Sequence, residues 1–215
     1  MVWTAAGADT LLTNVNIVDI ETGAVIEDQS VAIQDDLIGA VGTGLSTPAG
    51  AEIVNTAGRF LIPGLWDSHV HIFSTPNEPE TALPLYLLHG ITGIRDMGAL
   101  WPLSEQMKLQ DRLASGEVLG PRLILSGAWV DASPGSWPGM FLADTPEEAR
   151  AAVKRISGEG WAAVKSYSML DPSVYLALAD EARTYDIPLV GHIPEQVTLG
   201  AAIVAGQNGM EHFGR

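Results

Sequence analysis

Apolar and polar residues follow two different rhythms along this chain. Residues 10–57 contain short runs that alternate between apolar and polar positions, separated by turn-forming segments such as Glu21-Thr22-Gly23. This period of two is typical of strands, whose successive side chains point to opposite faces. Four short strands are expected, over residues 13–19, 25–34, 37–41 and 51–54. Their spacing predicts a small antiparallel sheet or sandwich.

From about residue 58 onward, strand and helix patterns alternate. Strand signals begin near residues 61, 91, 121, 161, 187 and 209, and helical patterns lie between them at 80–89, 101–115, from 145, 171–184 and 196–205. Thr145-Pro146-Glu147-Glu148 has the residues of a capping box, which marks the start of a helix. Such alternation favours parallel βα units, so the fold class is α/β, with a first domain over 1–60 and a second over 61–215.

Composition narrows the range of functions. The 215 residues include 26 acidic and 11 basic side chains, for a net charge of −15, and no cysteine. Non-specific binding to nucleic acid or to an anionic membrane needs a basic face, so neither is expected as a partner. Disulfides, thiolate metal sites and thiol nucleophiles are excluded. No apolar run reaches the ~18 residues of a membrane helix. The default location is cytoplasmic, and a periplasmic or secreted location after signal removal stays open.

Candidate chemistry lies where the expected strands end. His69 and His71 are two residues apart, so both imidazoles share one face of a strand and can reach one ion. Lys165, His192 and His212 end three later strands, the position at which barrel enzymes place catalytic groups. Taken singly, each of these histidines is more often structural than metal-binding, and Lys165 alone would be expected to be a snorkelling or salt-bridged lysine. His89 ends a helix, where an interaction with the helix dipole is preferred.

Other polar and aromatic residues are weaker candidates. Tyr167 has the strand parity of Lys165 and could donate a hydrogen bond to a developing oxyanion, although packing is equally expected. Arg95 is expected to form a polar pair with Asp96, either structural or at the substrate edge. Trp137, with Trp129 and Phe141, flanks a long loop that could line a substrate pocket, and surface packing is the alternative.

Several segments together resemble the amidohydrolase superfamily, in its imidazolonepropionase-related and prolidase-like branch. Residues 10–60 resemble the small β-sandwich that precedes the barrel in that superfamily. The matching motifs of the barrel are Leu61-Ile62-Pro63-Gly64-Leu65-Trp66-Asp67-Ser68-His69-Val70-His71, Gly90-Ile91-Thr92-Gly93-Ile94-Arg95-Asp96-Met97-Gly98, Gly120-Pro121-Arg122, Val190-Gly191-His192-Ile193-Pro194 and Met210-Glu211-His212.

The resemblance implies a binuclear metal centre. His69 and His71 would bind the more buried ion, and His192 and His212 the second. Lys165 would carry a CO2-derived carbamate that bridges the two ions. Zinc is the first expectation, with Mn, Co or Fe as alternatives, since imidazole and carboxylate-like ligands accept all four. A lysine among cations is shifted toward its neutral amine, the form that reacts with CO2.

The resemblance further implies a (β/α)8 TIM-type barrel that is incomplete, with six of eight strands, and an N-terminal β-sandwich piece. Residues 61–215 are fewer than the ~250 of a typical eight-stranded barrel. The aspartate that the superfamily places at the end of strand eight has no counterpart here. The chain is therefore expected to be truncated after barrel strand six.

The implied function is metal-dependent hydrolysis of a C–N bond by metal-activated hydroxide. The substrate would be a small molecule, an N-acyl amino acid or a dipeptide. The alternative is a truncated, catalytically inactive fragment that still binds metal. A remote third interpretation is a carbohydrate-binding or ligand-binding module built on Trp129 and Trp137. A homo-oligomer or a complementing C-terminal segment is the expected protein partner.

Overall fold

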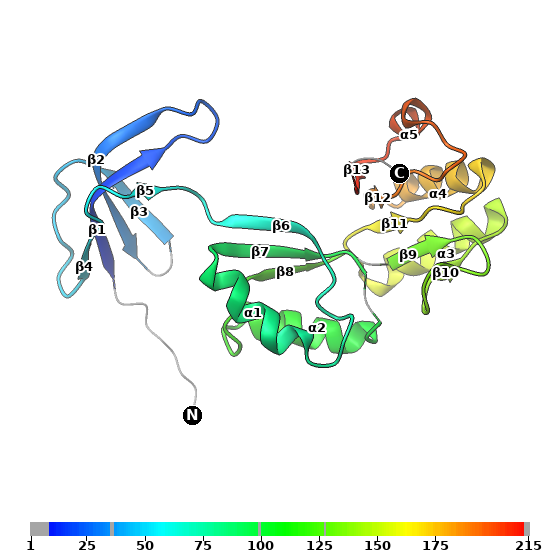
Figure 1. Ribbon diagram of the computed structural model, residues 1–215, viewed down its shortest axis with the longest axis horizontal. Helices are drawn as coiled ribbons and strands as arrows, with labels where there is room; N and C mark the ends of the chain where they lie inside the picture. Colours follow the sequence, from blue (N-terminus) through cyan, green and yellow to red (C-terminus); the bar gives the residue numbers. More distant parts are fainter. Residues whose placement is uncertain (1–8, 35–36, 99, 127, 213–215) are drawn as a thin grey trace. The chain divides into compact units, whose positions relative to one another are not determined.

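The computed structural model describes residues 9–34, 37–98, 100–126 and 128–212. The chain divides into two compact units, Met1–Pro63 and Gly64–Arg215, and Figure 1 labels their helices and strands. Within the described ranges, no helix is long and apolar enough to cross a membrane.

The first unit is a single five-stranded sheet in its described residues. Its strands are β1 (Thr10–Val18), β2 (Val25–Gln34), β3 (Leu37–Gly42), β4 (Glu52–Asn55) and β5 (Phe60–Leu61). The order is β3-β2-β1-β4, and β5 also pairs with β1. β1, β2 and β3 are antiparallel neighbours, whereas β4 and β5 run parallel to β1. The sheet is therefore mixed: the expected antiparallel pairing holds for β1, β2 and β3, and is wrong for β4, which runs parallel to β1.

The second unit alternates strands and helices. Its strands are β6 (Leu65–Val70), β7 (Ile91–Asp96), β8 (Arg122–Leu125), β9 (Ala128–Asp131), β10 (Phe141–Leu142), β11 (Val164–Ser166), β12 (Leu189–Gly191) and β13 (Gly209–Met210). Its helices are α1 (Glu78–Leu88), α2 (Leu103–Ala114), α3 (Pro146–Glu159), α4 (Pro172–Thr184) and α5 (Leu199–Ala205). This is an α/β fold, and strands and helices alternate as expected from the sequence, except that β9 and β10 are additional strands between β8 and α3.

All strand pairs of the second unit are parallel among its described residues. One sheet has the order β6-β7-β8 and the other β10-β9-β11-β12-β13. The expected strand from residue 121 appears as β8 and β9, one in each sheet, with position 127 between them outside the described residues. Ala162 N donates to Leu125 O at 3.0 Å, so the end of β8 contacts the chain leading into β11. The parallel ladders fit part of a TIM-type barrel.

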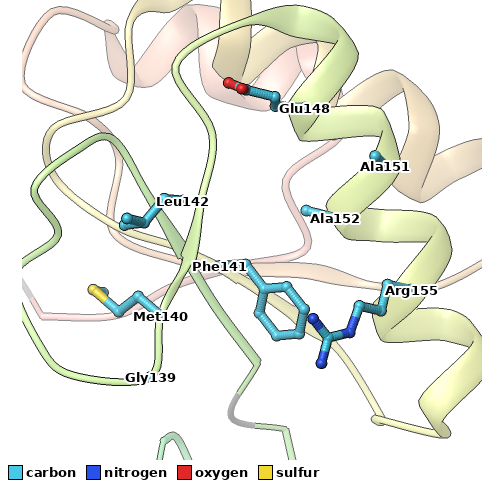
Figure 2. Close-up of a pocket in the computed structure, with 8 residues that line it drawn as sticks. All are labelled: Gly139, Met140, Phe141, Leu142, Glu148, Ala151, Ala152 and Arg155. Carbon is cyan, nitrogen blue, oxygen red and sulfur yellow. The ribbon is translucent and has the colours of Figure 1, made fainter.

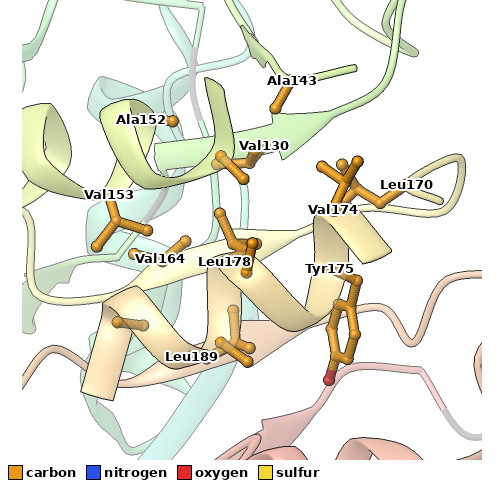
Figure 3. Close-up of a cluster of buried hydrophobic side chains, with 14 of the residues drawn as sticks. Val130, Ala143, Ala152, Val153, Val164, Leu170, Val174, Tyr175, Leu178 and Leu189 are labelled. Atoms are coloured by element: carbon orange, nitrogen blue, oxygen red, sulfur yellow. The ribbon is translucent and has the colours of Figure 1, made fainter. Parts of the chain in front are cut away.

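Side-chain alternation divides the second unit into layers. Val164 and Leu189 lie in a large apolar cluster beneath α3 and α4, and Figure 3 shows how Val153 and Leu178 meet them. Ile94 and Leu123 form a second cluster with α1 and α2. Residues of opposite parity form a small third cluster of Met97, Ala163 and Val190. Because neighbouring strand residues face opposite ways, Lys165 lies on the same side of the sheet as this third cluster, away from the helices.

Local signals fix where the helices begin. The Thr145 hydroxyl accepts from Glu148 N at 3.2 Å, and the Glu148 carboxylate accepts from Thr145 N at 3.0 Å, so the capping box is confirmed. α5 begins at Leu199 rather than at 196, because Thr198 is the residue whose side chain caps the helix, accepting from Ala201 N at 3.2 Å.

Candidate metal and hydrolytic site

The candidate residues of the second unit lie at or just beyond the carboxyl ends of its parallel strands. His69 is on β6 and His71 follows it, while His192 comes directly after β12 and His212 two residues after β13. The four rings form a chain of contacts. The ring centroids are 5.1 Å apart for His69 and His71, 4.5 Å for His69 and His212, and 5.1 Å for His192 and His212. We call these four side chains the histidine cluster. The fold thus brings together residues from distant parts of the sequence, as His69 and His212 show.

His69 and His71 aim the same ring nitrogen at each other. Their Nε2 atoms are 3.2 Å apart. His69 Nδ1 is 2.7 Å from Glu211 Oε2, and His71 Nδ1 is 2.9 Å from Gly98 O. A carboxylate and a carbonyl only accept, so in both neutral rings Nδ1 carries the proton and Nε2 a lone pair. Two facing lone pairs cannot bond each other, and a cation or a proton between them relieves the repulsion.

His192 is placed by a glycine and held by a hydroxyl. Gly191 has φ +112°, and a Cβ at this position would collide with the Ser166 carbonyl and the Lys165 side chain, so only glycine allows β12 to approach β11 this closely. His192 Nδ1 lies 2.8 Å from Ser168 Oγ, and its ring stacks on Tyr167 with centroids 4.2 Å apart. The other nitrogen of this ring is thereby left for a different partner.

Lys165 is buried in the interior of the second unit. Its side chain is 1% exposed, and Nζ donates to Met97 O at 3.0 Å. Burial lowers the pKa of its ammonium group to about 8, against the opposing pull of the Glu211 and Asp96 carboxylates. A substantial share of Lys165 is therefore neutral near pH 8, the protonation state that reaction with CO2 requires.

The histidines of the cluster are biased toward their neutral forms. Burial is the largest cause of the lowered pKa of His69 and of His71, and the nearby Lys165 charge acts in the same direction. Burial, followed by the charges of Lys165 and His212, lowers the pKa of His192 to about 4. Neutral imidazole is the form that binds a metal.

Arg95 and Asp96 do not pair with each other, so that expectation was wrong. Neighbouring residues on a strand point to opposite faces. Arg95 Nη2 lies 2.6 Å from Glu211 Oε1, and its Nε donates to Ser68 O at 2.8 Å. Asp96 is 1% exposed and accepts from the backbone N–H groups of Ile72 and Gly98. Burial raises the pKa of Asp96 to about 7. The role of Arg95 as a substrate contact stays a prediction.

Tyr167 and Trp137 are brought to the edge of the histidine cluster. Trp137 Nε1 donates to Tyr167 Oη at 2.8 Å, and the Trp137 ring, 53% exposed, lies 6.5 Å from that of Trp129. Trp129 in turn lies 6.1 Å from the His71 ring. A phenol and two indoles therefore stand beside the imidazoles, and their roles toward a substrate stay predictions.

His89 is not part of the site. It caps the C-terminal end of α1, where its Nδ1 lies 2.8 Å from Leu85 O. This contact agrees with the expected helix-end role for this histidine.

Two cavities of the second unit are lined by residues other than the four histidines of the cluster. One, of about 400 Å³, is lined by Phe141, Leu142 and residues of α3, and Figure 2 shows the Arg155 guanidinium beside the Phe141 ring. Another, of about 580 Å³, is lined by α2 residues together with Trp101, Trp129 and Trp161. Neither is lined by a histidine of the cluster, so neither is the candidate site.

The side chains at this site have the right chemistry for a divalent metal, although they are not arranged around a single ion position. In the described part of the chain, no group of three or more His, Asp or Glu side chains is arranged to hold an ion. The chemistry of the donors fits nonetheless, because two imidazole Nε2 atoms converge, further imidazoles adjoin them, and Lys165 is buried with a lowered pKa. The residues that would hold metal are His69, His71, Lys165, His192 and His212.

Three side chains that hold the site through hydrogen bonds were not among the candidates predicted from the sequence. Glu211 appears there only within a motif, Asp96 within a motif and as a partner for Arg95, and Ser168 does not appear. Their signal in the sequence is weak, because each acts through a residue far away in the chain or through a backbone group. The one usable signal for such residues is a position at the end of a strand, and Glu211 lies directly after β13.

Comparison with known proteins adds independent observations. No protein-family model matches the chain. A dihydroorotase of Pelobacter propionicus is 27% identical over 199 residues, which are 90% of this chain and 45% of the relative. An adenine deaminase of Cenarchaeum symbiosum is 37% identical over 91 residues, which are 40% of this chain and 14% of the relative. The chain thus spans about half or less of the length of these curated relatives.

Solved structures agree on the fold. A protein of Bifidobacterium longum, described provisionally as a prolidase, superposes with a TM-score of 0.82 at 26% identity, covering 95% of this chain and 54% of its own. A Xaa-Pro dipeptidase structure with bound methionine gives a TM-score of 0.77 at 20% identity, covering 95% and 61%. At 20% identity, the second likeness concerns the fold alone.

Parallel strands with imidazoles and a buried lysine at their carboxyl ends form an α/β fold that is consistent with part of a TIM-type barrel. The relatives by sequence are hydrolases that act on carbon–nitrogen bonds, and the neighbours by structure are of the prolidase and amidohydrolase kind. These similarities support the amidohydrolase superfamily, whose members generally use divalent metals.

Proposed function

We propose that this chain supplies the metal-binding part of a metal-dependent amidohydrolase that hydrolyses a C–N bond of a small molecule, an N-acyl amino acid or a dipeptide. Its second unit would be part of a (β/α)8 barrel, and its first unit part of a β-sandwich. The observation that carries the proposal is the pair of His69 and His71 Nε2 atoms, 3.2 Å apart, with both Nδ1 atoms bound to acceptors.

Two divalent ions, of which zinc is the first candidate, would activate water and polarise the substrate carbonyl when bound. His69 and His71 would hold the first ion through nitrogens that are already directed. His192 and His212 would hold the second, and Lys165 as a carbamate would join the two ions. The lowered pKa of Lys165, about 8, favours the neutral amine from which a carbamate forms.

Protein groups around the ions would orient the substrate. Tyr167 Oη accepts the Trp137 N–H, which leaves the phenol proton free to be donated toward a carbonyl oxygen that gains negative charge. The indole of Trp137 is exposed and gives an apolar surface for a substrate side chain. Neither group identifies the substrate, which is proposed only as a class.

The proposal is tested with the purified protein, zinc or manganese, and a panel of cyclic amides, N-acyl amino acids and dipeptides. Hydrolysis should require metal and should fall about 1,000-fold in Lys165→Ala, because the loss of a bridging ligand removes several kcal/mol of transition-state stabilisation. Lys154→Ala, in the exposed part of α3, is the matched control and should keep full activity. Bound metal is measured by elemental analysis.

Three outcomes separate the alternatives. Metal-dependent hydrolysis that is lost only in Lys165→Ala supports the proposal. Hydrolysis that survives in Lys165→Ala contradicts the role given to this lysine. Metal binding without hydrolysis of any substrate in the panel favours the alternative, an inactive fragment that retains its ligands.

A further inference from the structure

Glu211, which follows β13, lies between His69 on β6 and Arg95 on the neighbouring strand β7. Its Oε2 is 2.7 Å from His69 Nδ1 and its Oε1 is 2.6 Å from Arg95 Nη2. The side chain is buried, with 8% of its area exposed. Arg95 also donates through Nε to Ser68 O, the residue before His69. The contacts therefore form a closed ring through Ser68, Arg95, Glu211 and His69.

Each part of this ring has a definite chemical effect. The carboxylate only accepts, so the His69 Nδ1 carries the proton and its Nε2 presents a lone pair. A charged acceptor on a ligand histidine fixes the ring orientation and raises the basicity of the opposite nitrogen. Arg95 occupies the other carboxylate oxygen and so holds Glu211 in the orientation that faces His69.

His69 and His71 differ in the kind of acceptor that holds their Nδ1 protons. His71 Nδ1 donates to the backbone carbonyl of Gly98, an acceptor that is neutral and fixed by the chain itself. His69 instead depends on a side chain that arrives from beyond β13, in a different sheet from β6. Only one of the two ligand orientations is therefore under the control of a distant residue.

We infer that Glu211, held by Arg95, is a positioning residue that fixes the tautomer and orientation of His69 for metal binding. This inference rests on the proposed metal site, because His69 is a ligand only there. It also assigns Arg95 a role through Glu211 that differs from direct contact with substrate.

The first experiment needs no metal. Nitrogen-15 NMR of the metal-free protein near neutral pH, with the His69 signals assigned through His69→Gln, should show the proton on Nδ1. In Glu211→Ala the proton should shift in large part to Nε2. Persistence of the Nδ1–H tautomer in Glu211→Ala would overturn the inference, whether or not the protein binds metal. Failure of the metal site and failure of this inference are thus distinguished.

The second experiment titrates zinc alone into the metal-free protein, against a chromophoric chelator. Glu211→Ala should weaken zinc binding about 10- to 100-fold, the range for outer partners of metal ligands. Glu211→Gln keeps the side-chain volume and is used if the alanine variant unfolds. It should weaken binding several-fold, because its amide can accept from His69 but cannot replace the charge facing Arg95. Glu117 forms an exposed 2.6 Å pair with Arg112, so Glu117→Ala is the matched control and should bind zinc normally.

A double-mutant cycle tests the part played by Arg95. Arg95→Met should weaken zinc binding several-fold in the wild-type background, and by much less when Glu211 is already Gln, because Arg95 acts through that carboxylate. Equal effects in the two backgrounds would contradict this route. Unchanged zinc affinity in both Glu211 variants would also contradict the inference.

Discussion

The two histidine pairs of the candidate site differ in how firmly each ring is held. His69 and His71 each bind an acceptor through Nδ1, and their Nε2 atoms face each other at 3.2 Å. In the second pair, His192 contacts the Ser168 hydroxyl, a group that can donate or accept, while His212 is an exposed residue with φ +62° that makes ring contacts with His69 and His192. Under the proposed metal-binding role, the first pair would be organised for an ion in advance, whereas the second pair would need the ion to complete its arrangement.

The largest expected effect tests this difference directly. His71→Ala should weaken zinc binding more than about 100-fold, beyond the range for outer-shell partners, whereas His192→Ala should weaken it about 10-fold. The reason is that the preorganised pair contributes most to binding the first ion. Isothermal titration of the metal-free protein measures both affinities. Equal losses in the two variants would remove the distinction between the pairs.

Lys165 lies on β11, between the strands that carry the two pairs, and its burial should cost stability. Its pKa falls from 10.5 to about 8 on folding, so the cost is fully present below pH 8 and is lost as the pH rises from 8 to 10.5. Lys165→Met should stabilise the metal-free protein by about 2 kcal/mol at pH 7. The gain should shrink toward pH 10.

Urea unfolding at pH 7 and pH 10 measures this effect, with Lys154→Met on the exposed side of α3 as control. The Met97 carbonyl keeps the Trp129 N–H as a donor when the lysine is removed, so no buried acceptor is left without a partner. A change in stability that is the same at both pH values would show that the charge of Lys165 is not its cause.

A smaller effect is expected from the hydroxyl partner of His192. Ser168→Ala removes that contact and should weaken binding of the second ion by about 10-fold or less, the low end for outer partners, with the first ion unaffected. Ser115→Ala, in the exposed end of α2, is the control. Metal stoichiometry at increasing zinc concentration separates the two ions. Weakened binding of the first ion would show that the pairs are coupled more tightly than their contacts suggest.

The smallest expected effect concerns the aromatic edge beside the second pair. Trp137→Phe keeps the ring but removes the hydrogen bond to Tyr167, whose ring stacks on His192. The loss of about 1 kcal/mol should lower kcat/KM about 5-fold, with zinc affinity unchanged. Steady-state kinetics and zinc titration of the same preparation check both statements. A drop in zinc affinity would place Trp137 among the groups that support the ligands.

Regular elements of the second unit were predictable because their signals are local. The capping box at Thr145 and Glu148 forms between residues three apart, and the start of α3 predicted from it is confirmed. The helix that follows Asp171 was predicted for the same reason, since the Asp171 carboxylate accepts from Ser173 N. The parallel pairing of β4 and β5 with β1 was not predictable, because strand direction is decided by contacts between segments more than 40 residues apart.

For the site, the sequence alone determined which residue types stand at the strand ends: His69, His71, Lys165, His192 and His212. Period-two alternation and strand boundaries are properties of neighbouring residues, and they suffice to place a side chain at one end of a strand. Only the tertiary structure decided which atoms those side chains offer. The Nδ1 atoms of His69 and His71 are fixed by Glu211 and by Gly98 O, and Lys165 acquires its lowered pKa by burial. Proton position and desolvation depend on groups that are distant in the chain and close in space, so no local pattern contains them.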